Sequence, residues 1–330
     1  MGSSGESETC FLVSIEAVSF DETIVDTDDL STIRGASWAA LRTCDLFAGR
    51  LQDFLGGATV VSVYSGASQA LARVSGKVSR DDVERALADY FASMDIDGDG
   101  KPEREGMLLA EARRYLVFSH AITEEADGAD IFAANARARA VRQYQSMDID
   151  LPDVLPLEVR AASIADSADS AALKSNHRYR ADFERMATVP CVLDRRRPID
   201  RLLWETVDGK RMLTKAVSAS VAARRAFGRT GRRYQFFETE AGIADFRDRF
   251  FAADSLEEIA KDGCEALTDV PKALIGKMAV LSMDGNGFGK LRKEFTKGRG
   301  DRGQALGEFA RVMNGKRRAL LNQLVGLFAS

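Results

Sequence analysis

The chain is poor in the residue types from which most metal and disulfide sites are built. Its 330 residues include only two histidines, His120 and His177, and four cysteines that form no CxxC pair. A histidine-rich metallonuclease site and a zinc ribbon are therefore excluded, and a disulfide framework is not expected in a chain of this length. We infer a reducing compartment.

Long apolar runs and an excess of one charge are also absent. No run approaches the ~20 residues of a membrane span, and the first eight residues are polar and Gly/Ser-rich, unlike a signal peptide. We therefore expect a cytoplasmic protein with no membrane partner. With 46 Lys+Arg against 50 Asp+Glu, the net charge of −4 excludes a uniformly basic nucleic-acid coat but allows local patches.

The composition is that of a folded protein, with 45% hydrophobic and 29% charged residues and length for about two domains. Its first third predicts an α+β unit of the ferredoxin-like βαββαβ pattern. The expected elements are a strand at 11–20, a helix at 30–55 begun by Thr27-Asp28-Asp29, hairpin strands at 58–64 and 69–75, a helix at 79–93 and a strand at 114–120.

An acidic turn follows the second expected helix. Asp95, Asp97 and Asp99 are spaced like the start of a calcium-binding EF-hand loop, whose twelfth position must supply a bidentate carboxylate. That position is Gly106 here, although Glu103 and Glu105 lie close enough to substitute in part. The alternative is a carboxylate-rich turn without a metal.

The middle of the chain combines a polar linker, beginning near residue 145, with a strongly basic stretch. Residues 195–233 contain twelve Lys/Arg against three Asp/Glu, a net charge of +9, and aromatic residues alternate with the last arginines. This mixture suits phosphate neutralisation and base stacking. The predicted nucleic-acid patch consists of Arg224, Arg225, Arg229, Arg232 and Arg233. The alternative is a solvated helix whose aromatic side chains pack inward.

The sharpest local pattern is KMAVLSMDGNGFGKLRKEF, at 277–295. It predicts an apolar strand that ends at Asp284, then a glycine-rich turn and a helix. The Asp284 carboxylate and the Gly285 carbonyl are suitable ligands for Mg²⁺ or Mn²⁺. The residues predicted to bind the nucleoside triphosphate are Gly285, Asn286, Gly287, Phe288, Gly289 and Lys290.

Three other interpretations of this pattern were considered. A Walker A loop fails because Asp284 and Leu291 stand where Gly and Ser/Thr are needed, and the GxGxG spacing departs from the dinucleotide fingerprint GxGxxG. The remaining alternative is a tight strand-to-helix turn in which Asp284 only caps the helix.

Asp284-x-x-x-Phe288, placed between a strand and a helix, resembles the first metal motif of GGDEF-type nucleotidyl cyclases. It also resembles the related palm in the large polymerase-like subunit of type III CRISPR effector complexes. Three further stretches resemble the CRISPR branch: DTDDLSTIRGASWAAL (26–41), NARARAVRQYQ (135–145) and SASVAARRAFGRTGRRYQFF (218–237). The resemblance implies ATP as substrate, a catalytic metal ligand at Asp284, Phe288 packing near the nucleotide, and RNA and other effector subunits as partners.

The sequence departs from that family in its acidic hairpins. The first hairpin contains no acid between Tyr64 and Ser68, so a first palm would be catalytically dead, and no Gly-Gly-Asp-Asp follows Asp284. We expect a degenerate palm at 1–145, a basic, largely helical middle region at 146–275, and the start of a second palm at 276–330.

The complete protein is expected to join ATP into cyclic or linear oligoadenylate with two Mg²⁺ ions. The first alternative is a non-catalytic RNA-binding scaffold subunit, and the second is a split enzyme whose partner chain supplies the missing hairpin.

Overall fold

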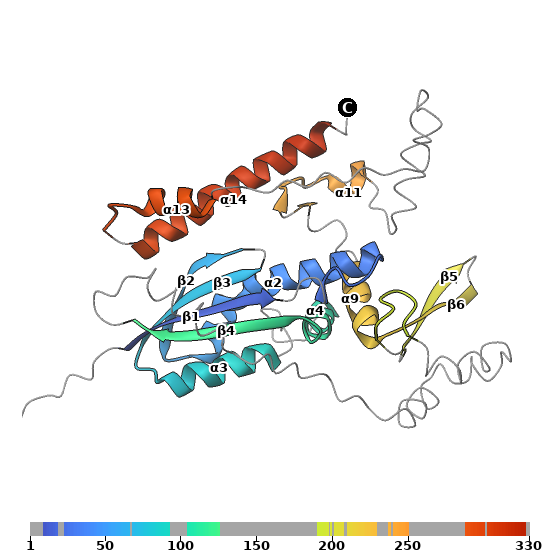
Figure 1. The fold of residues 1–330 in the computed structure, drawn as a ribbon, viewed down its shortest axis with the longest axis horizontal. Helices are drawn as coiled ribbons and strands as arrows, with labels where there is room; N and C mark the ends of the chain where they lie inside the picture. Colours follow the sequence, from blue (N-terminus) through green and yellow to red (C-terminus); the bar gives the residue numbers. More distant parts are fainter. Residues whose placement is uncertain are drawn as a thin grey trace, which may run out of the picture.

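The structure is a computed structural model. It describes residues 9–18, 23–66, 68–92, 104–125, 190–197, 199, 201–207, 210–229, 237–238, 240–250, 288–300 and 302–327. These residues form an α+β fold in which a four-stranded antiparallel sheet packs against helices (Figure 1). No helix among them is long and apolar enough to cross a bilayer.

The sheet contains β1 (Thr9–Val18), β2 (Ala58–Ser65), β3 (Gln69–Gly76) and β4 (Val117–Glu124), in the order β2-β3-β1-β4. Every neighbouring pair is antiparallel, and Val13 of β1 lies opposite Ala72 of β3 and Ile122 of β4. Because β1 is central, most of its residues are buried, which explains its nearly continuous apolar sequence.

Helices α2 (Leu30–Phe54) and α3 (Arg80–Ala92) cover one face of the sheet. The side chain of Asp29 begins α2 by accepting a hydrogen bond from the backbone N–H of Thr32 at 2.9 Å. The rings of Phe47 and Tyr90, from the two helices, meet edge to face with centroids 5.5 Å apart. Apolar residues at helical spacing on both helices thus form the main core with alternate residues of β1 and β3.

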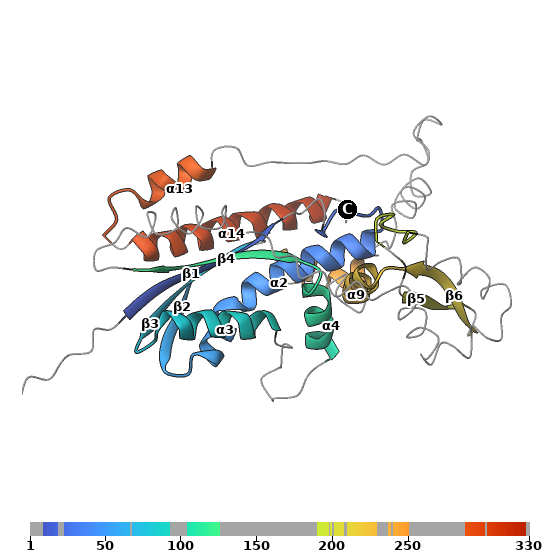
Figure 2. The same ribbon diagram turned by 60° about the horizontal axis from the view of Figure 1, so that its bottom comes forward.

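The opposite face of the sheet is covered in part by α14 (Arg302–Leu327), which follows the short helix α13 (Phe288–Thr296). Figure 2 shows α14 on one side of the sheet and α3 on the other. Leu306 of α14 packs with Leu12, Val63 and Leu71. A Cβ added at Gly307 would lie 2.9 Å from the carbonyl oxygen of Val63, so the helix backbone approaches β2 closely.

The described part of the middle region joins the same body. Helix α9 (Ala219–Arg229) packs against α2 and against α4 (Arg104–Arg113), and strands β5 (Arg201–Val207) and β6 (Lys210–Val217) form a hairpin before it. Helix α11 (Phe246–Arg249) begins with Phe246, whose ring stacks on those of Phe237 and Phe250. Leu321 and Val325, from the second half of α14, pack against this cluster.

The crossing of α2 and α9 depends on two glycines. A Cβ at Gly35 would lie 1.8 Å from the carbonyl oxygen of Arg224, and a Cβ at Gly228 would lie 2.1 Å from that of Ser31. Atoms at these distances overlap, so only glycine allows the two backbones to touch at both positions. The Arg34 side chain adds a hydrogen bond of 3.2 Å to the Gly228 carbonyl oxygen.

The sequence predicted most of the first 92 residues, including the first strand, the helix that Asp29 caps, the hairpin and the second helix. One boundary was wrong: the last strand begins at Val117 rather than 114, because residues 114–116 hydrogen-bond back to the end of α4. In the middle region expected to be largely helical, the described residues include the β5–β6 hairpin as well as α9, and most of that region lies outside the described residues.

We predict that Gly35→Ala destabilises the fold far more than Gly49→Ala. The added methyl at Gly35 forces α2 and α9 apart, which should lower the free energy of unfolding by about 3 kcal/mol or more. Gly49 lies exposed on the same helix with open space around it, so alanine there should stabilise the protein by up to about 1 kcal/mol. Urea unfolding measures both, and equal effects would contradict the close crossing.

Candidate functional site

The predicted metal and nucleotide motif is only partly within the described residues. Asp284, Gly285, Asn286 and Gly287 lie outside them. The helix predicted after this turn is confirmed, because α13 begins at Phe288. Gly289 and Lys290 are exposed in its first turn, and among the described residues no atom beyond the backbone of α13 and the residues next to Gly289 lies within 4 Å of a Cβ added there. The unpaired N–H groups of a helix start and a lysine ammonium both favour a bound anion.

Two arginines of the predicted patch, Arg224 and Arg225, lie inside the protein rather than on its surface. Arg224 is fully buried and Arg225 is 6% exposed, both on the side of α9 that faces α2. A buried guanidinium that is already paired with a carboxylate does not present its donors to a nucleic-acid phosphate. The prediction was therefore wrong for these two residues. Arg229 is half-buried, whereas Arg232 and Arg233 lie outside the described residues.

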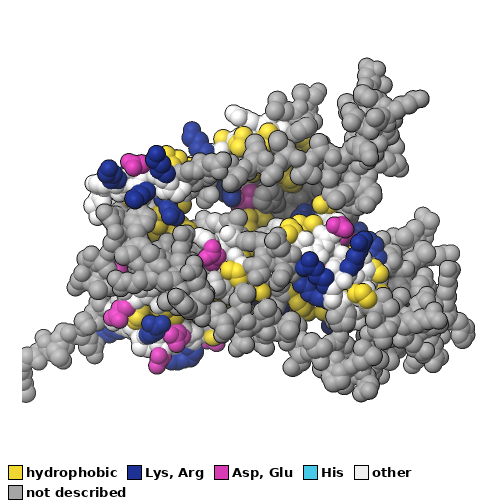
Figure 3. All heavy atoms as spheres, in the orientation of Figure 1, with side chains coloured by type: hydrophobic (Ala, Val, Ile, Leu, Met, Phe, Trp, Pro, Cys, Tyr) yellow, Lys and Arg dark blue, Asp and Glu magenta, His cyan; other side chains and the backbone are white. Residues whose placement is uncertain are grey.

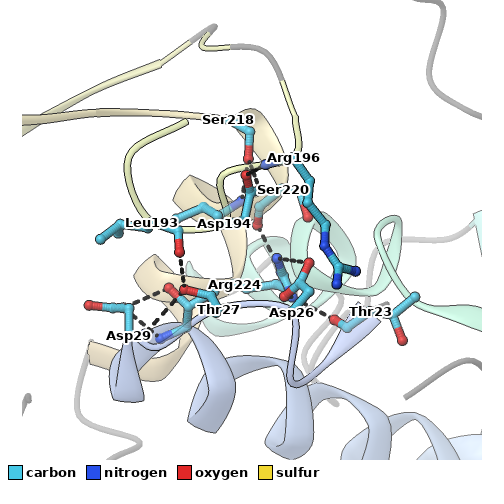
Figure 4. Close-up of polar contacts among 12 residues, drawn as sticks. Thr23, Asp26, Thr27, Asp29, Leu193, Asp194, Arg196, Ser218, Ser220 and Arg224 are labelled. Atoms are coloured by element: carbon cyan, nitrogen blue, oxygen red, sulfur yellow. Dashed lines mark hydrogen bonds and ion pairs between the residues drawn. The ribbon is translucent and has the colours of Figure 1, made fainter. Parts of the chain in front are cut away.

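Asp26 is the main partner of Arg224 (Figure 4). The Nη1 and Nη2 atoms of Arg224 donate to the two Asp26 carboxylate oxygens at 2.8 and 3.1 Å. Nη1 also donates to the carbonyl oxygen of Thr23 at 2.5 Å, and Nε donates to that of Ser220 at 3.2 Å. This planar fork fits a carboxylate better than a lysine would, because its parallel N–H groups meet both oxygens at once.

A second arginine and a second aspartate extend the contact toward the middle region. Arg197 pairs with Asp26 and also with Asp194, whose Oδ2 lies 3.1 Å from Arg197 Nη1. The other oxygen of Asp194 accepts the backbone N–H groups of Arg196 and Arg197, each at 3.1 Å. The Ser218 hydroxyl just before α9 donates to Asp194 at 2.9 Å. The turn at 194–197 is thereby fixed to α9.

Asp29 makes a third link between distant parts of the chain. It caps α2 through Thr32 and pairs with the nearly buried guanidinium of Arg225 on α9. Beside it, the Thr27 hydroxyl donates to the carbonyl oxygen of Leu193 at 2.8 Å. We call Asp26, Asp29, Asp194, Arg197, Arg224 and Arg225 the buried charge network.

The three aspartates of the buried charge network are held in their ionised form. Burial by itself opposes ionisation of Asp26, but hydrogen bonds and charge from Arg224 and Arg197 outweigh it and lower the pKa. Burial likewise opposes ionisation of Asp29, where Thr32 and Arg225 outweigh it, and of Asp194, where backbone N–H groups and Ser218 contribute most of the opposing effect. All three carboxylates are occupied by protein donors, so the network holds structure together and is not a catalytic centre.

The described residues offer no other strong candidate for metal or nucleophilic chemistry. Among them no group of three or more His, Cys, Asp or Glu side chains is placed to bind a metal. Burial, with smaller contributions from Asp45 and Glu16, raises the pKa of the Cys44 thiol to about 12, so this thiol is not a reactive nucleophile. The acids of the expected calcium loop at 95–103 lie outside the described residues, and 105–106 fall within α4.

A cavity of about 250 Å³ lies between the end of α2, the start of β2 and α3. Its charged lining consists of Lys77, Asp82, Arg85 and Asp89, two cations and two anions. This balanced lining does not favour a polyanion, and no residue of the predicted sites contributes to it.

Two comparisons with known proteins found no relative. No model of a known protein family matches the chain, and no curated protein matches it. The links that join the start of α2 to the middle region could not be recognised in the sequence, because their partners stand far apart: the Asp26–Arg224 bond spans 198 positions and the Asp26–Arg197 bond 171. The local signals were the N-cap spacing from Asp29 to Thr32 and the Asp194–Arg197 pair, three positions apart.

We predict that Arg224→Met lowers the free energy of unfolding by about 3–5 kcal/mol, because it leaves Asp26 buried with one partner fewer. The matched control is Arg80→Met, which removes an exposed pair with Glu84 and should cost less than about 1 kcal/mol. Adding Asp26→Asn to Arg224→Met should recover part of the loss. If Arg224→Met and Arg80→Met behaved alike in urea unfolding, the structural role of the network would be refuted.

We also predict a specific acid sensitivity. Because the folded pKa of Asp194 is lowered, its contribution to stability is complete above its unfolded pKa of about 3.9 and is lost as the pH falls through the folded value. The gap in unfolding free energy between the wild type and Asp194→Asn should therefore narrow below about pH 4. Burial lowers the pKa of His120, so protonation of this residue begins to destabilise the fold as the pH falls below about 6.5. This loss of stability is common to the wild type and the variant, and it cancels when their free energies of unfolding are subtracted. A gap that stayed constant down to pH 3 (~1 unit below the unfolded pKa) would contradict the prediction.

Proposed function

We propose that this chain is a palm-type protein related to the nucleotidyl cyclases and to the polymerase-like subunit of type III CRISPR effector complexes. In this proposal the complete protein joins ATP into cyclic or linear oligoadenylate, with Mg²⁺ or Mn²⁺ held at Asp284. The observation that carries the proposal is the arrangement of the sheet, together with the helix that starts inside the Asp284–Lys290 motif.

The sheet supports a ferredoxin-like palm at 1–145. Its strands follow the order β2-β3-β1-β4, with the β2–β3 hairpin on one side of β1 and β4 on the other. The elements run strand, helix, hairpin, helix, strand, with α4 added before the last strand, and α2 and α3 share one face. This arrangement supports the split βαβ pattern on which such palms are built, although the same frame also serves unrelated functions.

The start of α13 supports the proposed phosphate site. The motif needs a helix whose first turn is open to a triphosphate, and Gly289 and Lys290 are both exposed there. The free space around Gly289 fits a ligand that approaches the backbone. In the proposal Lys290 and the first backbone N–H groups of α13 bind phosphate, and Phe288 packs near the nucleotide.

Asp284 provides the carboxylate for the metal, with the Gly285 carbonyl as a second ligand. When bound, a pair of Mg²⁺ ions would activate a ribose 3′-hydroxyl and neutralise the triphosphate. No Gly-Gly-Asp sequence occurs in the 330 residues, so the second set of acidic ligands is not supplied by them. We therefore expect residues 1–330 to bind ATP with metal but to make no oligonucleotide.

This expectation can be tested by calorimetric titration of the chain with ATP in Mg²⁺. Asp284→Asn should weaken metal-dependent binding about tenfold or more, because it removes a charge-assisted contact worth about 1.5–3 kcal/mol. Gly289→Ala should leave the fold intact, since its Cβ meets nothing, yet weaken ATP binding by filling the space beside the phosphates.

The matched control is Glu294→Gln, which removes an exposed acid from the same helix outside the motif and should bind ATP as the wild type does. Equal binding by Asp284→Asn and the wild type, or no ATP binding at all, would refute the proposed site. Oligonucleotide formation by the chain alone, abolished by Asp284→Asn, would refute the claim that its active site is incomplete.

A non-catalytic RNA-binding scaffold subunit is the second candidate, and it now rests on different residues. The arginine patch on α9 no longer supports it, because Arg224 and Arg225 are buried. The observation that favours it is the large excess of exposed cations on α13 and α14. The proposed cytoplasmic location and the other effector subunits as partners apply equally to both candidates.

A further inference from the structure

The two C-terminal helices carry the second strongly basic stretch of the chain. Residues 288–327 contain ten Lys/Arg against three Asp/Glu, a net charge of +7 in a protein whose total is −4. Figure 3 shows Lys and Arg side chains gathered over α13 and the adjoining start of α14. Unlike the arginines of α9, most of these cations are exposed.

Most of these cations also lack an acidic partner within the described residues. Arg299 pairs with Glu308 and Arg317 pairs with Glu240, which accounts for two of them. We define the α13–α14 basic surface by four others that are exposed and have no ion pair with a described residue: Lys293, Lys297, Arg311 and Arg318. Lys290 is left out because it belongs to the proposed ATP site.

The cations lie in two rows on helices that are fixed to each other. Lys293 lies in α13 and Lys297 in the turn just after α13 ends at Thr296. Arg311 and Arg318 are two turns, or about 10 Å, apart on a stripe of α14 that continues through Gly315 and Asn322. All four positions of this stripe are exposed. The rings of Phe295 and Phe309, with centroids 5.5 Å apart, hold α13 against α14. The rows are therefore preorganised.

The chemistry of this surface favours the backbone of a nucleic acid. Base stacking requires an exposed aromatic ring, but Phe309 is buried and Phe295 is occupied by Phe309 and by the Arg299 guanidinium, 4.2 Å from its centroid. Recognition would therefore depend on phosphates. A duplex carries more charge per unit length than a single strand and releases more counterions per contact.

A membrane surface fits less well. An amphipathic helix that binds lipid inserts a continuous apolar face. In α14, Leu306 packs on the sheet, and Leu321 and Val325 pack near Phe246. The exposed Val312 and Leu320 are separated on the helix surface by Lys316, so they form no continuous apolar face.

We propose that the α13–α14 basic surface binds the phosphate backbone of double-stranded nucleic acid without reading its sequence. The inference rests on exposure and charge alone and does not depend on ATP binding at Asp284. It also differs from the earlier prediction for this protein, which placed nucleic-acid contacts on the arginines of α9.

The test is fluorescence anisotropy of the full chain with labelled RNA and DNA duplexes of about 20 base pairs, longer than the roughly 39 Å of α14. The plot of log affinity against log salt should have a steep negative slope. Replacing Lys293, Lys297, Arg311 and Arg318 by Gln should make that slope shallower by about 3–4 and weaken binding at least about tenfold. Replacement by the other cation, Lys by Arg and Arg by Lys, should restore both.

The matched control removes the same charge elsewhere, by replacing Arg42, Arg50, Arg80 and Arg85 with Gln; these arginines form ion pairs on α2 and α3. It should keep most of the affinity and slope. The quadruple surface variant should retain ATP binding, so failure of this proposal and failure of the ATP site are distinguishable. Equal losses in the two variants would overturn the proposal, as would absence of duplex binding. So would tighter binding to a single strand, to polyglutamate or to phosphatidylserine vesicles than to the duplexes.

Discussion

The contact between Gly35 and Gly228 sets how closely α9 packs against α2, and with it the position of the described middle region beside the first sheet. At this crossing the backbones of α2 and α9 touch, with no side chain between them. The close approach brings α9 near enough for its arginines to reach Asp26 and Asp29, just before α2 begins. A wider crossing would leave those acids and bases buried without partners, which is a costly arrangement.

The buried charge network follows from that crossing and makes it specific. Asp26 and Asp29 lie in the segment that enters α2, whereas their partners come from α9 and from the turn at 194–197. Apolar side chains alone would allow the helices to slide, but paired carboxylates and guanidinium groups are satisfied in only one register. We infer that the network defines how the basic middle region docks on the sheet, which is a structural role for arginines that look like nucleic-acid ligands.

The sheet separates two regions with different uses. One face holds the main core with α2 and α3, and α14 covers part of the other, where Gly307 comes close to β2. Because α13 packs against α14, the first turn of α13 with Gly289 and Lys290 is tied to the same body. The described part of the proposed ATP site, at the start of α13, and the α13–α14 basic surface therefore lie on one helical pair.

Several features were readable in the sequence because they are local. Alternating or continuous apolar residues predicted the strands of the first sheet, Thr27 to Asp29 predicted the start of α2, Gly66 marked the β2–β3 hairpin, and α13 was expected after Gly287. Others were misread for equally physical reasons. Helix α4 was not predicted, because the sequence before it was interpreted as an acidic turn. The β5–β6 hairpin was not predicted, because it lies within a basic stretch whose composition favoured helix.

What the sequence determined by itself was the order of the elements up to α3, the cap of α2, and the presence of two basic stretches. Only the tertiary structure decided which of the cations in those stretches are buried and which are exposed. A run of arginines has the same local pattern whether its partners are water, phosphate or buried aspartates, and here the aspartates stand nearly 200 residues earlier in the chain. Their meeting depends on a glycine-to-glycine helix crossing that no local pattern encodes. For this reason the arginines of α9 became part of the core, while the cations of α13 and α14 remained on the surface.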